Sequence, residues 1–572
     1  MNPGDSTNIR IGIVLTLSGL FGFLLGSVGH GTWQLAVESA QVLAGLVPYP
    51  HENPFYMHHT KLWSVLHQLC VPLIWLGISE RTLSFLFSGI MGMLSFQAAS
   101  LLVLTLSGDS FVALAAPFLI QFTHATRYCA IYPVLLMATS NTHGAIGLSL
   151  AVLILTLIAN HRYKVGMLLL AVSPAVHLSL GLLCWIIVFL CLLWDTVNTR
   201  QHLRDITKGF VIGATLTIIS LAIHITWYFD VPSASSDVMR KYLYPFLTNW
   251  DSHRVPVAWK NQGLQLNGAA LLIRASWLIK CRKSLDPKSG FLLRCLVVSA
   301  VFGIGFAILS QLSLESLPPV FLIMMPARIL ELNVLTFVPL LLGLASRHRC
   351  SFVYQLLSAA FVVCLIFTRA APWKVMLLFG FVIMLTPWIF KELKENQKPA
   401  TVLRSVTVVF LIWTVLQNMV DVDRFHNEPE EWNLFALSST SDRNLFEAAS
   451  KGKGMLLTCT DLHLIQLRTR RPVLLDGGQL DLLPYTYEAG PELERILREV
   501  YGVDFFHPPE EAKRTARIRV NASKSLWETR NVSEWKRIGS EFHFTEIMTY
   551  ADWKLQLPTI TRSQNLALYR IP

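Results

Sequence analysis

The chain has 572 residues, of which 53% are hydrophobic and 15% charged, and its mean hydropathy is +0.47. This composition excludes an ordinary soluble enzyme and indicates a polytopic membrane protein. The formal net charge is +11, but residues 421–572 carry 20 Lys and Arg against 22 Asp and Glu, which leaves 28 against 15 for residues 1–420. Because cytoplasmic loops of membrane proteins collect basic residues, we interpret the excess as a topology signal and expect no nucleic-acid partner.

The apolar runs predict a bundle of about 13 transmembrane helices. Ile11 to Gly29 is the first run, and we expect it to be retained because no small-residue cleavage site follows it. From Phe111 to Ser140 the apolar sequence is interrupted by prolines and polar residues, which predicts a broken helix. The run at 165–194 is interrupted at residues 173–177 and favours two short helices over one. The other runs lie at 62–78, 82–106, 143–159, 209–228, 264–279, 291–310, 327–345, 351–368, 373–390 and 403–420.

The basic connections predict the orientation of the chain. If they face the cytoplasm, the N-terminus is inside, whereas the loop at 30–61 and everything after residue 420 face outward. We therefore expect a multi-pass protein, of a bacterial inner membrane, with its C-terminal part in the periplasm. The connections in question lie at 161–164, 200–208, 280–294, 346–349 and 391–398.

The stretch from His30 to Gln68 is too long and too rich in turn-forming and aromatic residues for a simple connection between two membrane helices. It contains Glu38 and Glu52, the first two glutamates after the first apolar run. We interpret this stretch as an active-site element on the outer membrane surface.

After Asp421 the composition becomes that of a soluble domain of about 150 residues, which is a normal domain size. Its patterns predict a strand at 455–458, a helical turn at 461–467, a second strand at 472–476, an amphipathic helix at 491–501 and strands within 547–571. The predicted fold is thus a polytopic α-helical membrane domain, residues 1–420, followed by a small α/β domain, residues 421–572.

Met455 to Tyr485 reads MLLTCTDLHLIQLRTRRPVLLDGGQLDLLPY. It resembles the element of oligosaccharyltransferase catalytic subunits and C-mannosyltransferases in which a strand, an acidic turn, a helix, a basic residue and a second strand ending in Asp follow one another. With the long acidic first external loop and the broken helices, the chain resembles the GT-C class of lipid-linked sugar transferases. Cys459-Thr460-Asp461 stands where the tryptophan-rich motif of the oligosaccharyltransferase would begin, so recognition of a peptide sequon is not expected.

The resemblance implies transfer of a sugar from a polyprenyl phosphate or pyrophosphate donor to a glycan, lipid or protein acceptor at the outer membrane face, in cell-envelope glycan assembly. Such a transfer needs a carboxylate near the attacking hydroxyl, and in this class that carboxylate lies in the first external loop. Glu38 is the best match, with Gln34 one helical turn before it on the same face, and Glu52 is the second candidate. The alternative is that Glu38 only solvates the polar face of an interfacial helix, and the aspartate usual in the class is absent from this loop.

The departing lipid phosphate also requires cations or hydrogen-bond donors. Arg328, at the start of an apolar run, fits this role, because charges at membrane depth are often functional. The alternative is an internal ion pair with Glu331, one turn further along.

Two further groups are expected to contact donor or acceptor. One lies in the first external loop and the other in the loop at 229–263, which would close over a substrate but is equally consistent with a solvated loop. Their members are His58, His59 and Lys61, and Asp251, His253 and Arg254.

No set of residues has metal-ligand spacing, so we expect no tightly bound structural metal and at most a loosely held Mg²⁺ or Mn²⁺. His143 and His177 flank broken helices and are expected to be satisfied core residues. The expected partners are the lipid bilayer and the lipid-linked donor. Two competing hypotheses for the function remain: a transporter or flippase of the lipid-linked sugar, and a polymerase or ligase of the O-antigen type.

Overall fold

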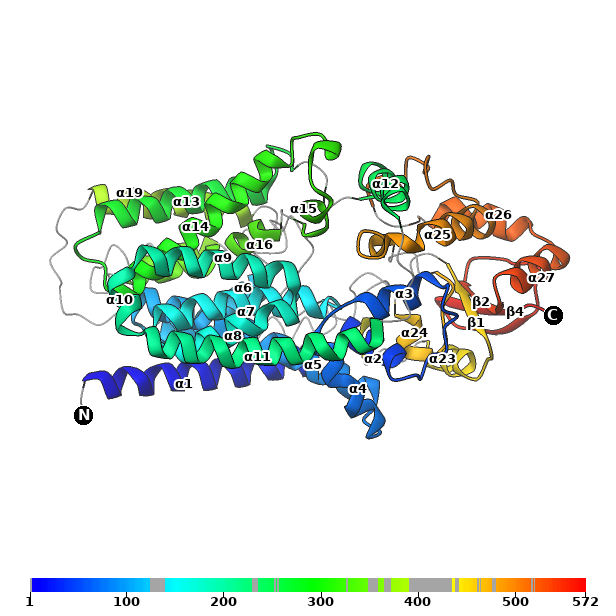
Figure 1. The fold of residues 1–572 in the computed structure, drawn as a ribbon, viewed down its shortest axis with the longest axis horizontal. Helices are drawn as coiled ribbons and strands as arrows, with labels where there is room; N and C mark the ends of the chain where they lie inside the picture. Colours follow the sequence, from blue (N-terminus) through cyan, green and yellow to red (C-terminus); the bar gives the residue numbers. More distant parts are fainter. Residues whose placement is uncertain are drawn as a thin grey trace.

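The computed structural model has an elongated shape, with a helical bundle at one end and a smaller domain with a β-sheet at the other (Figure 1). We call residues 442–572 the tail. The structure describes residues 3–123, 139–228, 235–251, 254, 257–325, 328–347, 359–364, 372–389, 435–437, 442–459, 462, 464–475, 480–515, 518 and 520–572. The predicted domain boundary near residue 421 and the predicted helix at 403–420 lie outside these residues.

Within the described residues, six helical segments are long and apolar enough to cross a membrane, and five shorter apolar helices accompany them. The predicted fold class, a polytopic helical membrane protein with a small C-terminal domain, is confirmed. The helices of this part are α1 (Pro3–Leu24), continued by η1 (Leu25–Gly29), α2 (Leu35–Leu43), α3 (Pro54–Lys61), α4 (Val65–Trp75), α5 (Glu80–Ser107), α6 (Ser110–Thr123), α7 (Thr142–Ala159), α8 (Tyr163–Val176), α9 (Leu178–Trp194), α10 (Thr196–Gln201), α11 (Leu203–Tyr228), α12 (Ser236–Pro245), η2 (Phe246–Trp250), α13 (Gln262–Lys280), α14 (Pro287–Leu309), η3 (Leu314–Ser316), α15 (Pro319–Ile323), α16 (Arg328–Leu335), α17 (Phe337–Arg347) and α19 (Pro372–Ile389).

Three apolar runs form helices that are shorter than the runs themselves. The run at 165–194 forms two helices, α8 and α9, that meet at His177, as predicted. The run at 327–345 is also divided, into α16 and α17. The run at 62–78 forms only the 11 residues of α4, about half of a membrane span. It is this short because Ser64 caps its start and Gly77, with a φ of +85°, turns the chain after its end.

Close packing of α1 against α5 depends on glycine. A Cβ atom placed on Gly22 would lie 2.3 Å from the carbonyl oxygen of Gly92, and one placed on Gly92 would lie 2.0 Å from that of Gly22. Small residues at a helix crossing let the two backbones approach closely in a membrane. This crossing fixes the exit of the chain from α1 toward α2, where Glu38 lies.

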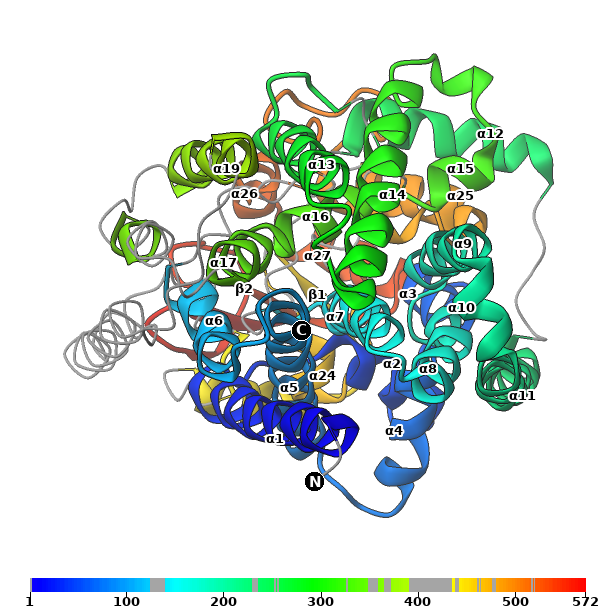
Figure 2. The same cartoon turned by 90° about the vertical axis from the view of Figure 1, so that its left-hand side faces the viewer.

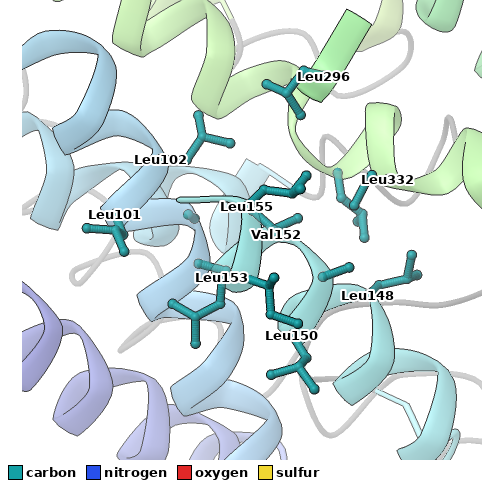
Figure 3. Packing of buried hydrophobic residues seen from close by; sticks show 14 of the residues in the cluster. Leu101, Leu102, Leu148, Leu150, Val152, Leu153, Leu155, Leu296 and Leu332 are labelled. Carbon is teal, nitrogen blue, oxygen red and sulfur yellow. The ribbon is translucent and has the colours of Figure 1, made fainter. Parts of the chain in front are cut away.

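The core of the bundle surrounds α7, which lies near the middle when the bundle is viewed end on (Figure 2). Figure 3 shows leucines of α7 packing between Leu101 and Leu102 of α5 and Leu296 and Leu332 of α14 and α16. A buried cation crosses this core, since Arg274 of α13 donates hydrogen bonds to the carbonyl oxygen of Leu296 at 2.9 Å, to Asn333 of α16 and, at 3.2 Å, to Thr336, which directly follows α16. These contacts fix α16, whose first residue is Arg328.

The basic connections gather at the end of the bundle that carries the N-terminus, opposite the tail (Figure 1). Arg162 donates a hydrogen bond to Asn8, and Arg294 pairs with Asp195 at 2.8 Å. Arg347 pairs with Asp286 at 3.0 Å. This arrangement agrees with the predicted sorting of charge; the connection at 391–398 lies outside the described residues.

The tail contains a four-stranded sheet in the order β1-β2-β4-β3, with β1 parallel to β2 and the other pairs antiparallel. The strands β1 (Met455–Thr458), β2 (Phe544–Tyr550), β3 (Thr559–Arg562) and β4 (Leu566–Arg570) confirm the predicted strands at 455–458 and within 547–571. The predicted second strand at 472–476 is wrong as a strand over the described residues 472–475, where only Val473 forms a bridge, to Leu456. The remaining elements are α23 (Arg443–Ser450), α24 (Ile465–Thr469), η4 (Leu480–Leu482), η5 (Tyr487–Ala489), α25 (Gly490–Ile496), η6 (Leu497–Tyr501), α26 (Val520–Thr529) and α27 (Val532–Glu541).

Candidate functional site

The stretch from His30 to Gln68 folds into two short helices, α2 and α3, between the bundle and the tail (Figure 1). Asn53 accepts a hydrogen bond from the backbone N–H of Phe55 at 2.8 Å, and Pro54 occupies the first helical position, so this sequence starts α3 where it does. Glu38 lies in the first turn of α2 and only 3% of its surface is exposed. The predicted helices of this stretch are therefore present, and they lie between the bundle and the tail; their position outside the membrane stays a prediction.

Two arginines meet at Tyr485 of the tail. The hydroxyl oxygen of Tyr485 accepts hydrogen bonds from Arg254 at 3.2 Å and from Arg328 at 3.4 Å, and its hydrogen points to the sulfur of Met325 at 3.9 Å. Arg328 also donates to Nε2 of His177 at 2.7 Å. Because a guanidinium only donates, Nε2 must accept, so His177 is neutral with its proton on Nδ1.

The hydrogen-bond partners of the two arginines differ. Arg254 is fully buried between two carboxylates, Asp251 and Asp481, each at 2.9 Å. Arg328 donates hydrogen bonds to the imidazole of His177 and to the hydroxyl of Tyr485. Both guanidinium groups are thus fixed by hydrogen bonds at the tail end of the bundle.

Histidines extend this group toward α3, α4 and α7. The ring of His58 lies 6.3 Å from that of Tyr485, and the ring of His67 lies 6.4 Å from that of His143. Among the described residues, no hydrogen-bond partner reaches Nδ1 of His58 or either ring nitrogen of His67. We call the whole set the histidine–arginine cluster: His58, His67, His143, His177, Arg254, Arg328 and Tyr485.

Burial lowers the pKa of His58 to about 4, against the opposing effect of the Asp481 carboxylate. Burial likewise lowers the pKa of His59, and the neighbouring His58 contributes in the same direction. Both imidazoles are therefore neutral at pH 7 and act there as hydrogen-bonding groups, not as cations.

The tail segment at 481–488 supplies the other polar groups of the interface. Asp481 and Tyr485 contact Arg254, and Glu488 forms an ion pair with Lys61 of α3. The ammonium of Lys61 also lies 5.6 Å from the ring centre of Tyr487. Lys61, which was predicted to contact substrate, is thus held by the tail.

Glu38 is connected to the cluster through its neighbour. Ser39 hydrogen-bonds Nδ1 of His59 at 3.0 Å, and the ring of His59 lies 5.7 Å from that of His58. The early acidic stretch and Arg328 therefore lie at the same, tail end of the bundle, as the sequence interpretation required.

The other predicted site residues have different environments. Gln34 is fully buried, and its side chain bonds Thr32, Ser88, Thr139 and Thr142, so it anchors α2 to the bundle. Glu52 is exposed in a turn. Glu331 is fully buried on α16. His253 lies outside the described residues, as do Asp461 and Asp476 of the tail motif.

Sequence reasoning did not select several members of the cluster. His143 and His177 were interpreted as satisfied core residues, although His177 contacts Arg328. Asp481 and Tyr485 were not singled out; the only signal was the alternation of acidic and aromatic residues in the segment DLLPYTYE. Their role depends on a contact over 157 residues of sequence between Arg328 and Tyr485.

Within the described part of the chain, no group of three or more His, Cys, Asp or Glu side chains is arranged to hold a metal ion. The prediction concerning a loosely held divalent ion stays a prediction.

No protein-family model matches the sequence, and no curated protein does. Among solved structures, the chain is similar to the crystal structure of ArnT from Cupriavidus metallidurans bound to undecaprenyl phosphate, with 13% identity and a TM-score of 0.40 over 100% of this chain and 98% of that one. It is also similar to the same protein in the apo state, with 12% identity and a TM-score of 0.37 over 100% of this chain and 99% of that one. The side chains of the cluster, and not this similarity, support the function proposed below.

Proposed function

We propose that this protein is a membrane glycosyltransferase that moves a sugar from a polyprenyl phosphate or pyrophosphate donor to an acceptor at the outer face of the membrane. The supporting observation is the meeting of Arg328 and Arg254 on one hydroxyl, that of Tyr485, at the tail end of the apolar helices. Guanidinium groups bind phosphate with charge and geometry together. A lipid phosphate whose hydrocarbon chain lies in the bilayer can bind at this end of the apolar helices without leaving the membrane.

In this proposal the two arginines have separate roles. Arg328 binds the donor phosphate and stabilises the charge that develops on it as the sugar departs. Arg254, neutralised by Asp251 and Asp481, fixes Tyr485 and the loop before α13 in place. Glu331, one turn after Arg328 on a fully buried face, supports the start of α16.

Glu38 accepts the proton of the attacking hydroxyl. It is the buried carboxylate of the first external stretch, and Ser39 and His59 connect its helix to the cluster. Glu52 is the weaker candidate because it is exposed. His58, with a neutral imidazole next to Tyr485, is suited to donate or accept a hydrogen bond from a sugar hydroxyl.

The opposite placement of the N-terminus and the tail supports an outward-facing site. With the basic connections on the cytoplasmic side, the tail lies in the periplasm of a bacterial inner membrane. The acceptor is a glycan, lipid or protein of the cell envelope.

Release of the lipid phosphate tests this proposal. The purified chain in nanodiscs is supplied with undecaprenyl phosphate carrying glucose, mannose, galactose or N-acetylglucosamine, with and without a lipid or glycan acceptor, and free undecaprenyl phosphate is measured. Wild type should release it from at least one donor, Glu38→Gln should lose at least 100-fold in rate, and Glu447→Gln, at an exposed tail carboxylate, should retain full rate.

Two results would contradict the proposal. Movement of intact donor between leaflets without release would favour the transporter hypothesis. Polymer growth from a lipid-linked glycan as donor, with no release from any single-sugar donor, would favour the polymerase hypothesis.

A further inference from the structure

The tail reaches into the bundle through α24, which lies next to α2 (Figure 1). The carboxamide nitrogen of Gln466, in α24, donates to the backbone carbonyl oxygen of Glu38 at 3.1 Å and to the side-chain oxygen of Gln41 at 3.4 Å. Its carboxamide oxygen accepts a hydrogen bond from the hydroxyl of Tyr49 at 2.8 Å. One side chain thus joins the first turn of α2, its last turn and the segment that follows it.

A second set of contacts fixes the same helix from the bundle side. Gln41 donates to Glu80, at the start of α5, at 3.1 Å and to the carbonyl oxygen of Leu467 at 3.0 Å. Glu80 in turn receives two hydrogen bonds from Arg470, at 2.7 and 2.8 Å. Bidentate carboxylate–guanidinium pairs are among the most directional contacts in proteins, so α24 and α5 hold α2 between them.

The conformation of α24 is itself imposed by the fold. Leu464 before it and Arg470 after it have φ values of 60° and 54°, in the left-handed region that non-glycine residues seldom adopt. Arg468 lies with its guanidinium carbon 3.5 Å from the ring centre of Phe446 in α23. A helix of five residues bounded by two such residues keeps this shape because the tail on one side and α2 on the other both hold it.

We propose that Gln466 is a positioning residue for the transfer reaction, which ties the backbone of Glu38 to the tail and so holds the carboxylate in register with the cluster. The inference rests on the proposed function, because it assumes that Glu38 is the proton acceptor. It adds that the tail takes part in the chemistry at a distance, by fixing α2, as well as through Tyr485. A shift of about 1 Å in a catalytic group is enough to slow a reaction on the order of 100-fold.

The decisive variants change one side chain of this contact. Gln466→Leu removes both hydrogen-bonding functions at similar size, and Gln466→Glu keeps the acceptor for Tyr49 but removes the donor to the Glu38 carbonyl. Gln311→Leu is the matched control, since Gln311 also donates to backbone carbonyls, those of Val257 and Ala307, on a different element.

The rate is measured with the undecaprenyl phosphate sugar that wild type uses fastest, as kcat per mole of bound undecaprenyl phosphate, so that unfolded protein does not count. Gln466→Leu should lower kcat per site by at least tenfold, with Kd for undecaprenyl phosphate within threefold of wild type. The acid limb of its pH–rate profile should move by at least half a pH unit, because the surroundings of the base change. A merely destabilised protein would keep both kcat per site and its pH profile, because only folded, lipid-binding protein is counted. Gln466→Glu should show at least half of the decrease in log kcat per site that Gln466→Leu shows. Gln311→Leu should change neither kcat per site nor the pH–rate profile.

Two outcomes would overturn the inference, and they are distinguishable. If Glu38→Gln abolishes release but Gln466→Leu keeps wild-type kcat per site and pH profile, Gln466 does not position the base, and the proposed function stands. If Glu38→Gln keeps the full rate, Glu38 is not the proton acceptor, and both the inference and that part of the proposed function fail.

Discussion

The glycine crossing between α1 and α5 gives a sharp test of the packing that leads to the site. In Gly22→Ala, the new Cβ would lie 2.3 Å from the carbonyl oxygen of Gly92, 2.7 Å from its carbonyl carbon and 2.8 Å from Cβ of Phe96. Contacts of Cβ under 3.0 Å are essentially never found, so α1 must withdraw by at least 0.7 Å, the difference between 3.0 and 2.3 Å. Overpacking of this kind costs about 1–3 kcal/mol, against a gain of about 0.5–1 kcal/mol from replacing a helical glycine.

The same helix offers a matched control. A Cβ on Gly12 meets nothing within 4 Å, so Gly12→Ala should keep the propensity gain and suffer no clash. We expect the free energy of unfolding, measured by SDS titration in mixed micelles, to fall by roughly 1–2 kcal/mol in Gly22→Ala. In Gly12→Ala it should be unchanged or rise by up to about 1 kcal/mol.

Because α1 leads into the stretch that carries Glu38, Gly22→Ala should also lower the rate of undecaprenyl phosphate release. Gly92→Ala should reproduce both effects, since its Cβ would lie 2.0 Å from the carbonyl oxygen of Gly22. Equal unfolding free energies for Gly22→Ala and Gly12→Ala would refute the close crossing and the reasoning built on it.

Three further changes test the site. Arg328→Gln removes a charged donor, and such a hydrogen bond contributes about 1.5–3 kcal/mol. The Kd for undecaprenyl phosphate should therefore rise about tenfold or more in Arg328→Gln and stay much closer to wild type in Arg328→Lys. Equal Kd values for all three proteins would show that Arg328 does not bind the phosphate. Arg470→Gln breaks the bidentate pair with Glu80, in which Arg470 is half exposed, so the free energy of unfolding in SDS should fall by about 1 kcal/mol. Arg443→Gln, at an exposed pair, should leave it unchanged. Identical unfolding curves for the two variants would contradict this. Burial holds the pKa of His58 at about 4 in the folded protein, below its ordinary 6.5, so the unfolded chain takes up the proton first. Stability should therefore be fully present above pH 6.5 and fall as the pH drops toward 4, less steeply in His58→Gln; the same slope in both proteins would argue against a buried neutral imidazole.

Much of the fold follows from local patterns. A membrane-length apolar run forms a helix because no other structure satisfies its backbone in lipid, so α1, α5, α7 and α14 could be predicted from residue type alone. The break between α8 and α9 was visible in the sequence at Pro174, in the last turn of α8. The second strand of the tail was predicted wrongly, because the apolar run at 472–475 is buried by packing around a single bridge, and burial alone does not distinguish a strand from an irregular segment.

The site could be predicted only in part. Glu38 was selected because the resemblance to the GT-C class implies a carboxylate in the first external loop, and Arg328 because a charge next to an apolar helix is costly and needs a reason; their roles stay predictions. His177 was not selected, since a single histidine between apolar helices has the same sequence environment whether it is inert or bonded to an arginine. Glu52, chosen on the same grounds as Glu38, is exposed.

The sequence by itself determined the class of this protein: the apolar runs, the sorting of basic residues and the change of composition after the last run specify a membrane bundle with a separate C-terminal domain. Only the tertiary structure decided which polar side chains act together. Gln466 lies 428 residues from Glu38, and Tyr485 lies 231 residues from Arg254. Local sequence patterns cannot predict contacts between residues so far apart in the chain. The packing of the tail against α2 and α3 brings these groups together, and that packing is a sum of many weak contacts spread over the bundle and the tail.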